Sequence, residues 1–330
     1  MSDDGRFWPA GDRDAALMQA APVTDLVCPR CRQPPDAWPI DPTTLRCTNP
    51  ACTVEYSKLP GTEIEFVSAG VFDVEANPSV GFDDENAMRA WVAGLEPGSD
   101  HWEQALMVGN YANAHHGQNR PMFSALLDRF IAPNCSQINT AVDLGCGVGA
   151  FTGLLARRLA SEVIGLDSWA MALRVAEAQA GPDPVHVPTL GNDAKLTVTS
   201  LQAPTTQSPP IRWVCGDILD PPLPAGSFDL VTAISVFDSV SNPLVALGQA
   251  SALLRPGGLL LIAQPDAWAA HVTPPEGWLS SDGEAWQQLM GHYELETIDQ
   301  EDGFTWVLAR GPRTQYRYVS HAMLARRRGN

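Results

Sequence analysis

The chain has 330 residues and a formal net charge of −17, from 38 acidic and 21 basic side chains. This acidity disfavours a nucleic-acid partner, because the one basic cluster, Arg326 to Arg328, is short. No apolar run reaches the roughly 20 residues that a membrane-spanning helix needs, and the first residues lack the features of a signal peptide. We therefore expect a cytoplasmic protein without a membrane partner.

Changes in composition divide the chain into four parts. Residues 1–21 are polar and aperiodic and are predicted to be mobile. Residues 22–75 carry four cysteines, and residues 76–105 have the composition of a linker around one short helix that ends near Pro97. Residues 106–330 are predicted to form the larger domain.

Four of the seven cysteines form two close pairs, Cys28 with Cys31 and Cys47 with Cys52. The spacer between the pairs lets them meet around one tetrahedral ion, and soft thiolate ligands select zinc or iron. A closed four-sulfur site leaves no open position for catalysis, so we predict a structural zinc ion. The alternative is four unrelated buried cysteines.

The sequence around these cysteines resembles the zinc ribbons of the Trm112-like group, in the stretches LVCPRCRQPP, LRCTNPAC and YSKLPGTEIEFV. Members of that group support methyltransferases, either as separate partners or as fused domains. The resemblance therefore implies that residues 22–75 form a zinc-ribbon domain that accompanies a methyltransferase.

From Ala141 onward, short apolar runs alternate with helical patterns: TAVDLG, EVIGLD, IRWVCGD, FDLVTAIS and LLLIAQ. Strands separated by helices predict an α/β fold with a parallel sheet and right-handed crossovers. Residues 181–210 form a longer interval, rich in Pro, Thr and Ser, before the third run. Loops of this length are typically functional or disordered, so a long loop is expected there.

The stretch DLGCGVG at the end of the first run is the strongest candidate for a ligand site. Asp143 ends the strand, and Gly145, Gly147 and Gly149 remove side chains where the backbone must approach a ligand. The spacing differs from the dinucleotide pattern G-x-G-x-x-G, in which a helix N-terminus meets a pyrophosphate. S-adenosylmethionine carries no phosphate, so it suits this loop better.

Two further aspartates follow the next strands in order. Asp167 is placed to accept hydrogen bonds from ribose hydroxyls, and Asp217 can receive an adenine amino group. Together these motifs resemble the class I S-adenosylmethionine-dependent methyltransferases over at least residues 141–264. The resemblance implies a Rossmann-like fold with a seven-stranded, mostly parallel sheet. It implies donor binding by Asp143, Gly145, Gly147, Gly149, Asp167, Ser168, Asp217, Ile218 and Ile234.

Segments outside this core resemble the methyltransferase of ovothiol biosynthesis over about residues 106–328. The matching stretches are YANAHHG with Tyr111 and His115, SVFDSV with Asp238, WAAHVTPPEGWL with Trp268 and Trp278, and RGPRTQYRY with Arg310, Tyr316 and Tyr318. The resemblance implies methyl transfer to the imidazole of a thiohistidine or of its selenium analogue.

A neutral imidazole nitrogen is already nucleophilic, so such a site must mainly align the ring and fix its tautomer. Asp238 is the first candidate for this task, with Tyr111 and His115 closing the pocket. Predicted acceptor-binding residues are Arg310, which can pair with a carboxylate, Trp268, Trp278 and Tyr316. The structural alternatives are a solvated or helix-capping Asp238, a surface Arg310 at a strand end, and tryptophans that anchor loops to the core.

Three other functions stay open. A different small-molecule O- or N-methyltransferase would share every donor motif. An RNA or protein methyltransferase could use the zinc ribbon for recognition, although the ribbon lacks stacked basic and aromatic residues. A non-catalytic scaffold is disfavoured by the intact glycines and Asp167.

Overall fold

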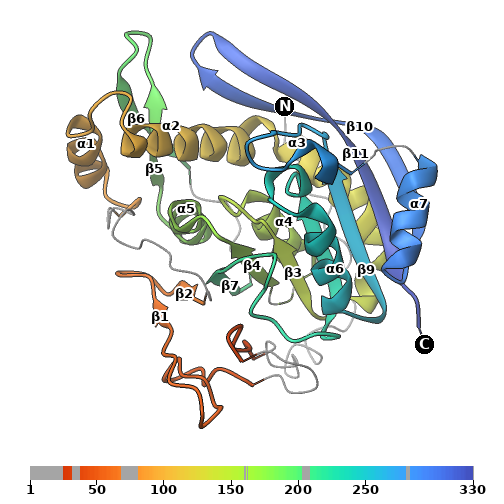
Figure 1. Cartoon of the computed structure of the whole chain (residues 1–330). Helices are drawn as coiled ribbons and strands as arrows, with labels where there is room; N and C mark the ends of the chain where they lie inside the picture. The colour runs from red at the N-terminus through yellow and green to blue at the C-terminus, as the bar shows by residue number, and fades with distance from the viewer. Residues whose placement is uncertain are drawn as a thin grey trace.

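The computed structural model describes residues 25–31, 38–67, 81–159, 161, 163–202, 209–279 and 283–329. The segment 1–21, for which mobility is predicted, lies outside the described residues, as do parts of the predicted zinc ribbon and linker. A central sheet carries helices on both faces (Figure 1). No helix in the described part of the chain is both long and apolar enough to cross a membrane.

The sheet has nine strands in the order β1-β2-β7-β4-β3-β8-β9-β11-β10. In that order the strands are β1 (Ser57–Lys58), β2 (Glu65–Phe66), β7 (Ile211–Cys215), β4 (Val163–Asp167), β3 (Ala141–Leu144), β8 (Phe228–Ile234), β9 (Leu254–Gln264), β11 (Thr314–Arg327) and β10 (Leu295–Gly311). The seven strands from β7 to β10 in this order correspond to the seven-stranded sheet that the family resemblance implied. The other two strands, β1 and β2, come from the cysteine-bearing part of the chain and extend the sheet beyond β7.

The five apolar runs predicted as strands form β3, β4, β7, β8 and β9, and every pairing among them is parallel. The predicted α/β fold with a mostly parallel sheet is therefore confirmed. From β3 the chain passes to β4 and β7 on one side and then to β8 and β9 on the other. This reversal of direction creates a crevice at the carboxyl ends of β3 and β8, where ligands bind in open α/β sheets.

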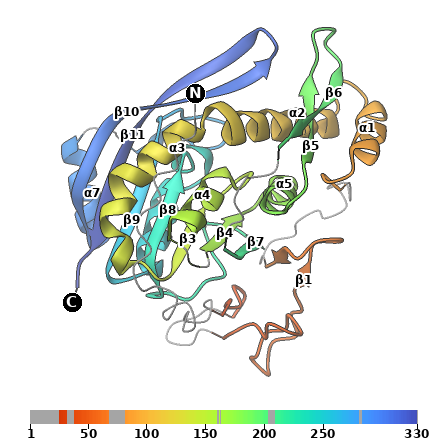
Figure 2. The same ribbon diagram turned by 180° about the vertical axis from the view of Figure 1, so that it is seen from behind.

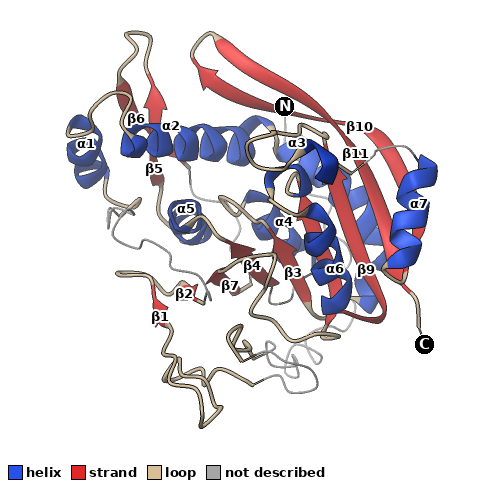
Figure 3. Cartoon of the chain, viewed as in Figure 1, coloured by secondary structure: helices blue, strands red, loops and turns tan. Residues whose placement is uncertain are grey.

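Seven α-helices are described: α1 (Glu85–Ala93), α2 (Asp100–Asn113), α3 (Arg120–Leu126), α4 (Ala150–Leu159), α5 (Ala170–Ala180), α6 (Pro243–Leu253) and α7 (Gly283–His292). One apolar cluster joins α3 and α4 to the sheet, and another joins α6 and α7 to the opposite face. Figure 3 shows these two helical layers, and Figure 2 shows α2 and α3 from behind. The linker helix α1 ends at Gly94, slightly before the position expected from Pro97.

The cysteine segment, described over residues 25–31 and 38–67, is joined to the edge of the sheet by backbone hydrogen bonds. Strand β2 pairs in parallel with β7, and Phe66 lies opposite Cys215. The Val67 N–H donates to the Cys215 carbonyl at 2.9 Å, and the Val27 N–H donates to the Pro222 carbonyl at 3.0 Å. The segment therefore holds both β7 and the loop that follows it.

The same segment covers apolar surface that no helix covers. Residues 216–227, which connect β7 to β8, are fully described and contain no helix. One face of β4 and β7 instead packs against side chains of the cysteine segment, because Leu26, Ile40 and Tyr56 belong to the same buried cluster as Ile164 and Val214. Burial of this shared apolar surface stabilises both parts of the chain.

The described part of the interval 181–210, namely residues 181–202 and 209–210, contains a β-hairpin, so the expectation of a long loop there is wrong. Its strands are β5 (Val185–Leu190) and β6 (Leu196–Leu201), which pair outside the main sheet. The stretch VHVPTLGNDAKLTVTSL alternates apolar and polar residues around a Gly-Asn-Asp turn, which is the strand signal that the proline and threonine content obscured. At Gly109 of α2, an added Cβ would lie 1.6 Å from the Pro188 oxygen, so helix and hairpin pack backbone to backbone.

Glu65 and Arg212 form the polar part of the contact between β2 and β7. The guanidinium binds both carboxylate oxygens, and the two side chains are 10% and 18% exposed. We expect Glu65→Ala to lower the free energy of unfolding by about 3 kcal/mol, because the partly buried Arg212 guanidinium would lose the Glu65 carboxylate. Chemical denaturation followed by circular dichroism measures this change.

Glu55→Ala is the matched control, because Glu55 forms an exposed ion pair with Arg46 in the same segment. Exposed pairs contribute little, so this variant should unfold like the wild type. Equal stability of both variants would show that the Glu65 pair does not hold the segment on the sheet.

Candidate active site

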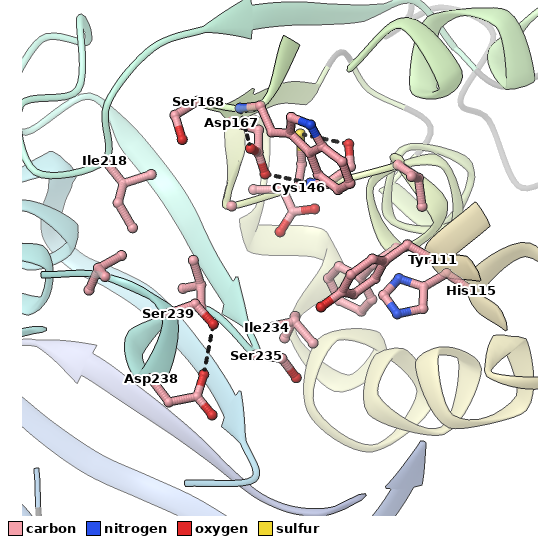
Figure 4. A pocket seen from close by; sticks show the side chains of 18 of the residues that line it. Tyr111, His115, Cys146, Asp167, Ser168, Ile218, Ile234, Ser235, Asp238 and Ser239 are labelled. Carbon is pink, nitrogen blue, oxygen red and sulfur yellow. Dashed lines mark hydrogen bonds between the residues drawn. The ribbon is translucent and has the colours of Figure 1, made fainter. Parts of the chain in front are cut away.

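A cavity of about 890 Å³ opens at the carboxyl ends of β3, β4, β7 and β8. Its lining comes from the segments that follow these four strands and from α2, α3, β10 and β11. Figure 4 shows Asp167, Tyr111 and Asp238 reaching it from three different elements. The crevice predicted by the strand order and the cavity therefore coincide.

The three glycines of the DLGCGVG loop all have positive φ, but they serve different purposes. A Cβ at Gly145 would lie 2.2 Å from Val236, and one at Gly149 would lie 2.6 Å from Ala176 and Trp213. Nothing lies within 4 Å of a Cβ built at Gly147. Gly145 and Gly147 both line the cavity, and only Gly147 has open space at the Cβ position, whereas Gly145 and Gly149 also allow tight packing against Val236, Ala176 and Trp213.

Asp143 holds the glycine loop in place. The Thr152 hydroxyl of α4 donates to one carboxylate oxygen at 2.6 Å, and the Thr232 hydroxyl of β8 donates to the other at 2.7 Å. Burial raises the pKa of Asp143 to about 6. Asp143 lines the cavity, and these two bonds join the strand end before the glycine loop to α4 and β8.

Asp167 is oriented by backbone groups of two segments. The Gly147 N–H donates to one carboxylate oxygen at 2.7 Å, and the Trp169 N–H donates to the other at 2.8 Å. Burial raises the pKa of Asp167, and the backbone hydrogen bonds oppose that shift. A carboxylate oxygen has more than one acceptor position, so Asp167 can still bind a diol in the cavity.

The other predicted donor residues also line this end of the cavity, namely Ser168, Asp217, Ile218 and Ile234. Asp217 accepts a hydrogen bond from the Leu219 N–H at 2.8 Å, which fixes its exposed side chain at the rim. Phe66 of the cysteine segment lies in the same lining. Phe66 was not predicted from the sequence, because no local pattern connects residue 66 to the glycine loop.

Aromatic rings form another wall of the cavity. Tyr111 and His115 lie edge to face with ring centroids 5.2 Å apart (Figure 4). Trp306 lies 5.7 Å from His115, and Tyr318 stacks on Trp306 at 4.3 Å. Trp306 was missed from the sequence, although its alternation with Phe304 along β10 is the signal that could have revealed an inward-facing side chain.

Asp238 lines the cavity from the short helix Phe237–Ser239 after β8, and it is 5% exposed. One carboxylate oxygen accepts the Ala267 N–H at 2.8 Å, and the other accepts the Ser239 hydroxyl at 3.3 Å. Burial raises its pKa. The structure thus places Asp238 beside Tyr111 and His115 in one cavity and also makes it an anchor for the loop after β9.

The remaining predicted acceptor residues do not line the cavity. Arg310 lies over the ring of Tyr316 at 5.7 Å, and both are exposed on the β10–β11 hairpin. Trp268 and Trp278 stack on each other with centroids 6.2 Å apart, and the Trp278 indole N–H donates to the Thr273 carbonyl. These two tryptophans brace the loop after β9 instead of walling the cavity.

The sulfur atoms of Cys28, Cys31, Cys47 and Cys52 all lie within 4.8 Å of one another. A tetrahedral ion with metal–sulfur bonds of about 2.3 Å needs sulfurs roughly 3.8 Å apart, so the cluster fits such an ion. The Asn49 backbone N–H donates to the Cys47 sulfur at 3.4 Å, and the Tyr56 hydroxyl lies 3.1 Å from the Cys28 sulfur. Hydrogen bonds of this kind orient metal ligands.

Residues 142–262 match the family model described as a methyltransferase domain. The chain is 31% identical over 129 residues to an uncharacterized 37.1 kDa protein in transposon TN4556 of Streptomyces fradiae, covering 38% of this chain and 30% of that protein. It is 30% identical over 172 residues to a ubiquinone biosynthesis O-methyltransferase of Methylobacterium, covering 50% of this chain and 59% of that enzyme. The chain thus spans less than two thirds of the length of these relatives.

Two solved structures are also similar. One is a SAM-dependent methyltransferase from Methanosarcina mazei, with 18% identity, a TM-score of 0.41, and coverage of 58% of this chain and 93% of that one. The other is a chain of the complex between the Trm112 methyltransferase activator of Haloferax volcanii and a methyltransferase, with 16% identity, a TM-score of 0.43, and coverage of 73% of this chain and 98% of that one. Strand order, the glycine loop and the family match agree, and the chain therefore contains a methyltransferase domain with a Rossmann-like fold.

Proposed function

We propose that this protein transfers a methyl group from S-adenosylmethionine to a small molecule, and that the small molecule is a thiohistidine-type imidazole. The observation that supports it best is the single cavity in which the glycine loop and Asp167 share a lining with Tyr111, His115 and Asp238. Donor and acceptor must meet in one enclosed space for methyl transfer, because the reaction is an in-line displacement.

The residues at the glycine-loop end fit the donor. Gly147 leaves its surface open, and the oriented Asp167 carboxylate can accept hydrogen bonds from ribose hydroxyls. Asp217 at the rim can accept an adenine amino group, and Ile218 and Ile234 add apolar surface. When bound, S-adenosylmethionine supplies an electrophilic methyl group on a sulfonium sulfur.

The cavity volume favours a small acceptor. About 890 Å³ lies within the range of roughly 300–1,000 Å³ that small-molecule sites occupy, and the donor takes part of it. A net charge of −17 disfavours RNA as the acceptor. Specific support for a thiohistidine-type ring comes from the sequence motifs that place Tyr111, His115 and Asp238 together.

Asp238 can orient an imidazole acceptor. A carboxylate that accepts a hydrogen bond from one ring nitrogen leaves the other nitrogen unprotonated and nucleophilic. Its burial disfavours bulk water as a competing partner. The Ala267 N–H occupies one direction of this carboxylate, which leaves further acceptor positions for a substrate.

O-methylation of a phenol-type acceptor is the second candidate, because one relative of this chain is a ubiquinone biosynthesis O-methyltransferase. A hydroxyl group must lose its proton when it attacks the methyl carbon, so this reaction needs a proton acceptor. Asp238 lines the cavity, and burial raises its pKa, so its carboxylate could accept this proton.

A methyl-transfer assay separates these functions. Purified protein and S-adenosylmethionine are incubated with histidine, 5-thiohistidine, its selenium analogue, a catechol or total cellular RNA, and products are identified by mass. We expect one added methyl group on a histidine derivative and no product with Asp167→Ala, whose donor affinity should fall. Product on the catechol alone would favour O-methylation, and product on RNA alone would contradict a small acceptor.

Asp238→Asn tests the role of the carboxylate. We expect kcat to fall at least about tenfold, because the amide can no longer accept equally at both atoms, while the Kd for S-adenosylmethionine stays unchanged. Asp193→Asn, at the exposed turn of the β5–β6 hairpin, is the matched control and should retain full activity. Unchanged kcat in Asp238→Asn would remove this residue from the mechanism.

We also propose that residues 22–75 form a zinc-ribbon domain with one structural zinc ion on Cys28, Cys31, Cys47 and Cys52. Cys28→Ser should lose the metal, measured by elemental mass spectrometry, and should lower the melting temperature, because metal binding contributes to folding. Cys135→Ser, outside the cluster, should keep both. A full equivalent of zinc in Cys28→Ser would contradict the four-cysteine site.

A further inference from the structure

Two polar nitrogen atoms in the aromatic wall of the cavity have no hydrogen-bond partner. They are Nε2 of His115 and Nε1 of Trp306, and both atoms are buried. Their rings lie edge to face with centroids 5.7 Å apart, and both residues line the cavity. A buried polar group without a partner costs free energy, so two of them on adjacent rings need an explanation.

Elsewhere this chain does satisfy the same two side-chain types. Nε2 of His116, the next residue, lies 2.8 Å from the Val148 carbonyl oxygen. The Trp278 indole N–H donates to the Thr273 carbonyl at 2.9 Å. Other buried polar atoms of the described residues also lack a partner, but only His115 and Trp306 among them line this cavity.

The neighbours of the pair are rings that offer it no partner. Phe123 lies 5.4 Å from His115, edge to face, and Tyr318 stacks against Trp306. Burial, and then the neighbouring His116, lower the pKa of His115 to about 3, so its ring is neutral at physiological pH. The pair thus combines one obligatory donor, the indole N–H, with an imidazole nitrogen that accepts when the proton is on Nδ1.

Resting on the proposed function, we propose that His115 Nε2 and Trp306 Nε1 bind a neutral group of the acceptor that both donates and accepts a hydrogen bond. A hydroxyl group accepts from the indole N–H and donates to the imidazole. An azole ring does the same through its two nitrogens. The pair would select such acceptors over apolar rings of the same size.

Charged groups fit the pair less well. An ammonium group has no acceptor for the indole N–H. A carboxylate has no proton to donate to the imidazole, so it would leave Nε2 of His115 without a partner. The neighbouring His116 supplies no positive charge, because burial lowers its pKa to about 4.

The pair is also separate from the predicted donor contacts. His115 lies on the helical turn Ala114–Gln118 after α2, and Trp306 lies on β10. The predicted donor residues lie at or just after the carboxyl ends of β3, β4, β7 and β8. Changes at the pair should therefore alter acceptor binding and leave the affinity for the spent donor, S-adenosylhomocysteine, unchanged.

Calorimetric titration of the full chain, saturated with S-adenosylhomocysteine, tests this assignment with four probes: phenol, imidazole, toluene and benzoate. Wild-type protein should bind phenol and imidazole at least about fivefold more tightly than toluene, which matches phenol in shape but lacks the hydroxyl. Trp306→Phe keeps a ring and removes the N–H, and His115→Phe removes the acceptor. Each should abolish most of the preference over toluene.

The controls are Trp91→Phe on α1 and His186→Gln on β5, which lie outside the cavity lining and should keep the wild-type preference.

NMR of the wild-type protein labelled with ¹⁵N gives an independent measurement that needs no variant. Phenol should shift one indole N–H resonance that toluene leaves in place, and the absence of such a shift would overturn the proposal.

Three calorimetric results would also overturn the proposal. The wild-type protein could bind phenol, imidazole and toluene equally, or it could bind benzoate most tightly. In the third result, Trp306→Phe binds S-adenosylhomocysteine more weakly but keeps the wild-type preference among the probes. The proposed function fails by a different result. If the protein prefers phenol and imidazole over toluene but transfers no methyl group to any acceptor, the pair is a binding site and the methyltransferase assignment is wrong.

Discussion

The structure depends on how one uncovered face of the sheet is buried. Residues 216–227 between β7 and β8 contain no helix, so apolar side chains of β4 and β7 would face water on that side. The cysteine segment covers them and adds β2 to the edge of β7. Burial of apolar surface and completion of backbone hydrogen bonds act at the same place, so neither part has a satisfied surface without the other.

The cysteine segment reaches the cavity through its contacts with strand β7. Strand β7 ends at Cys215, and the residues after it line the cavity near the predicted adenine position. The Val67 N–H bonds Cys215, and Phe66 reaches the same lining. A segment whose composition suggests an independent domain therefore supplies part of the wall of the candidate active site.

The two ends of the cavity are built by different physical means. At the glycine-loop end, Asp143 and Asp167 are held by hydroxyl and backbone donors, so this end is fixed before any ligand arrives. At the aromatic end, His115 and Trp306 rest in ring contacts that leave their nitrogens unpaired. One end suits a constant donor, and the other suits selection among acceptors.

The sequence predicted those parts of the molecule that local patterns determine. Apolar runs marked the five central strands, the glycine spacing located the loop, and cysteine spacing predicted the cluster of sulfur atoms. It did not predict contacts between residues distant in the chain. These are the stacking of Trp268 on Trp278, the close approach of Gly145 to Val236, and the pairing of β2 with β7. Residues that are adjacent in the sequence carry no information on which distant side chain a given residue will contact in the folded protein.

Unpaired polar atoms inside an apolar wall have a consequence for selectivity. A purely apolar pocket discriminates ligands mainly by size, and one extra methylene or hydroxyl changes binding only modestly. The indole N–H and the imidazole nitrogen already lack partners in the free protein, so a ligand that pairs them gains two hydrogen bonds and a ligand that leaves them unpaired gains none. On the proposed assignment, His115 and Trp306 therefore favour matching acceptors by this added hydrogen bonding, while the surrounding rings provide affinity that is common to both.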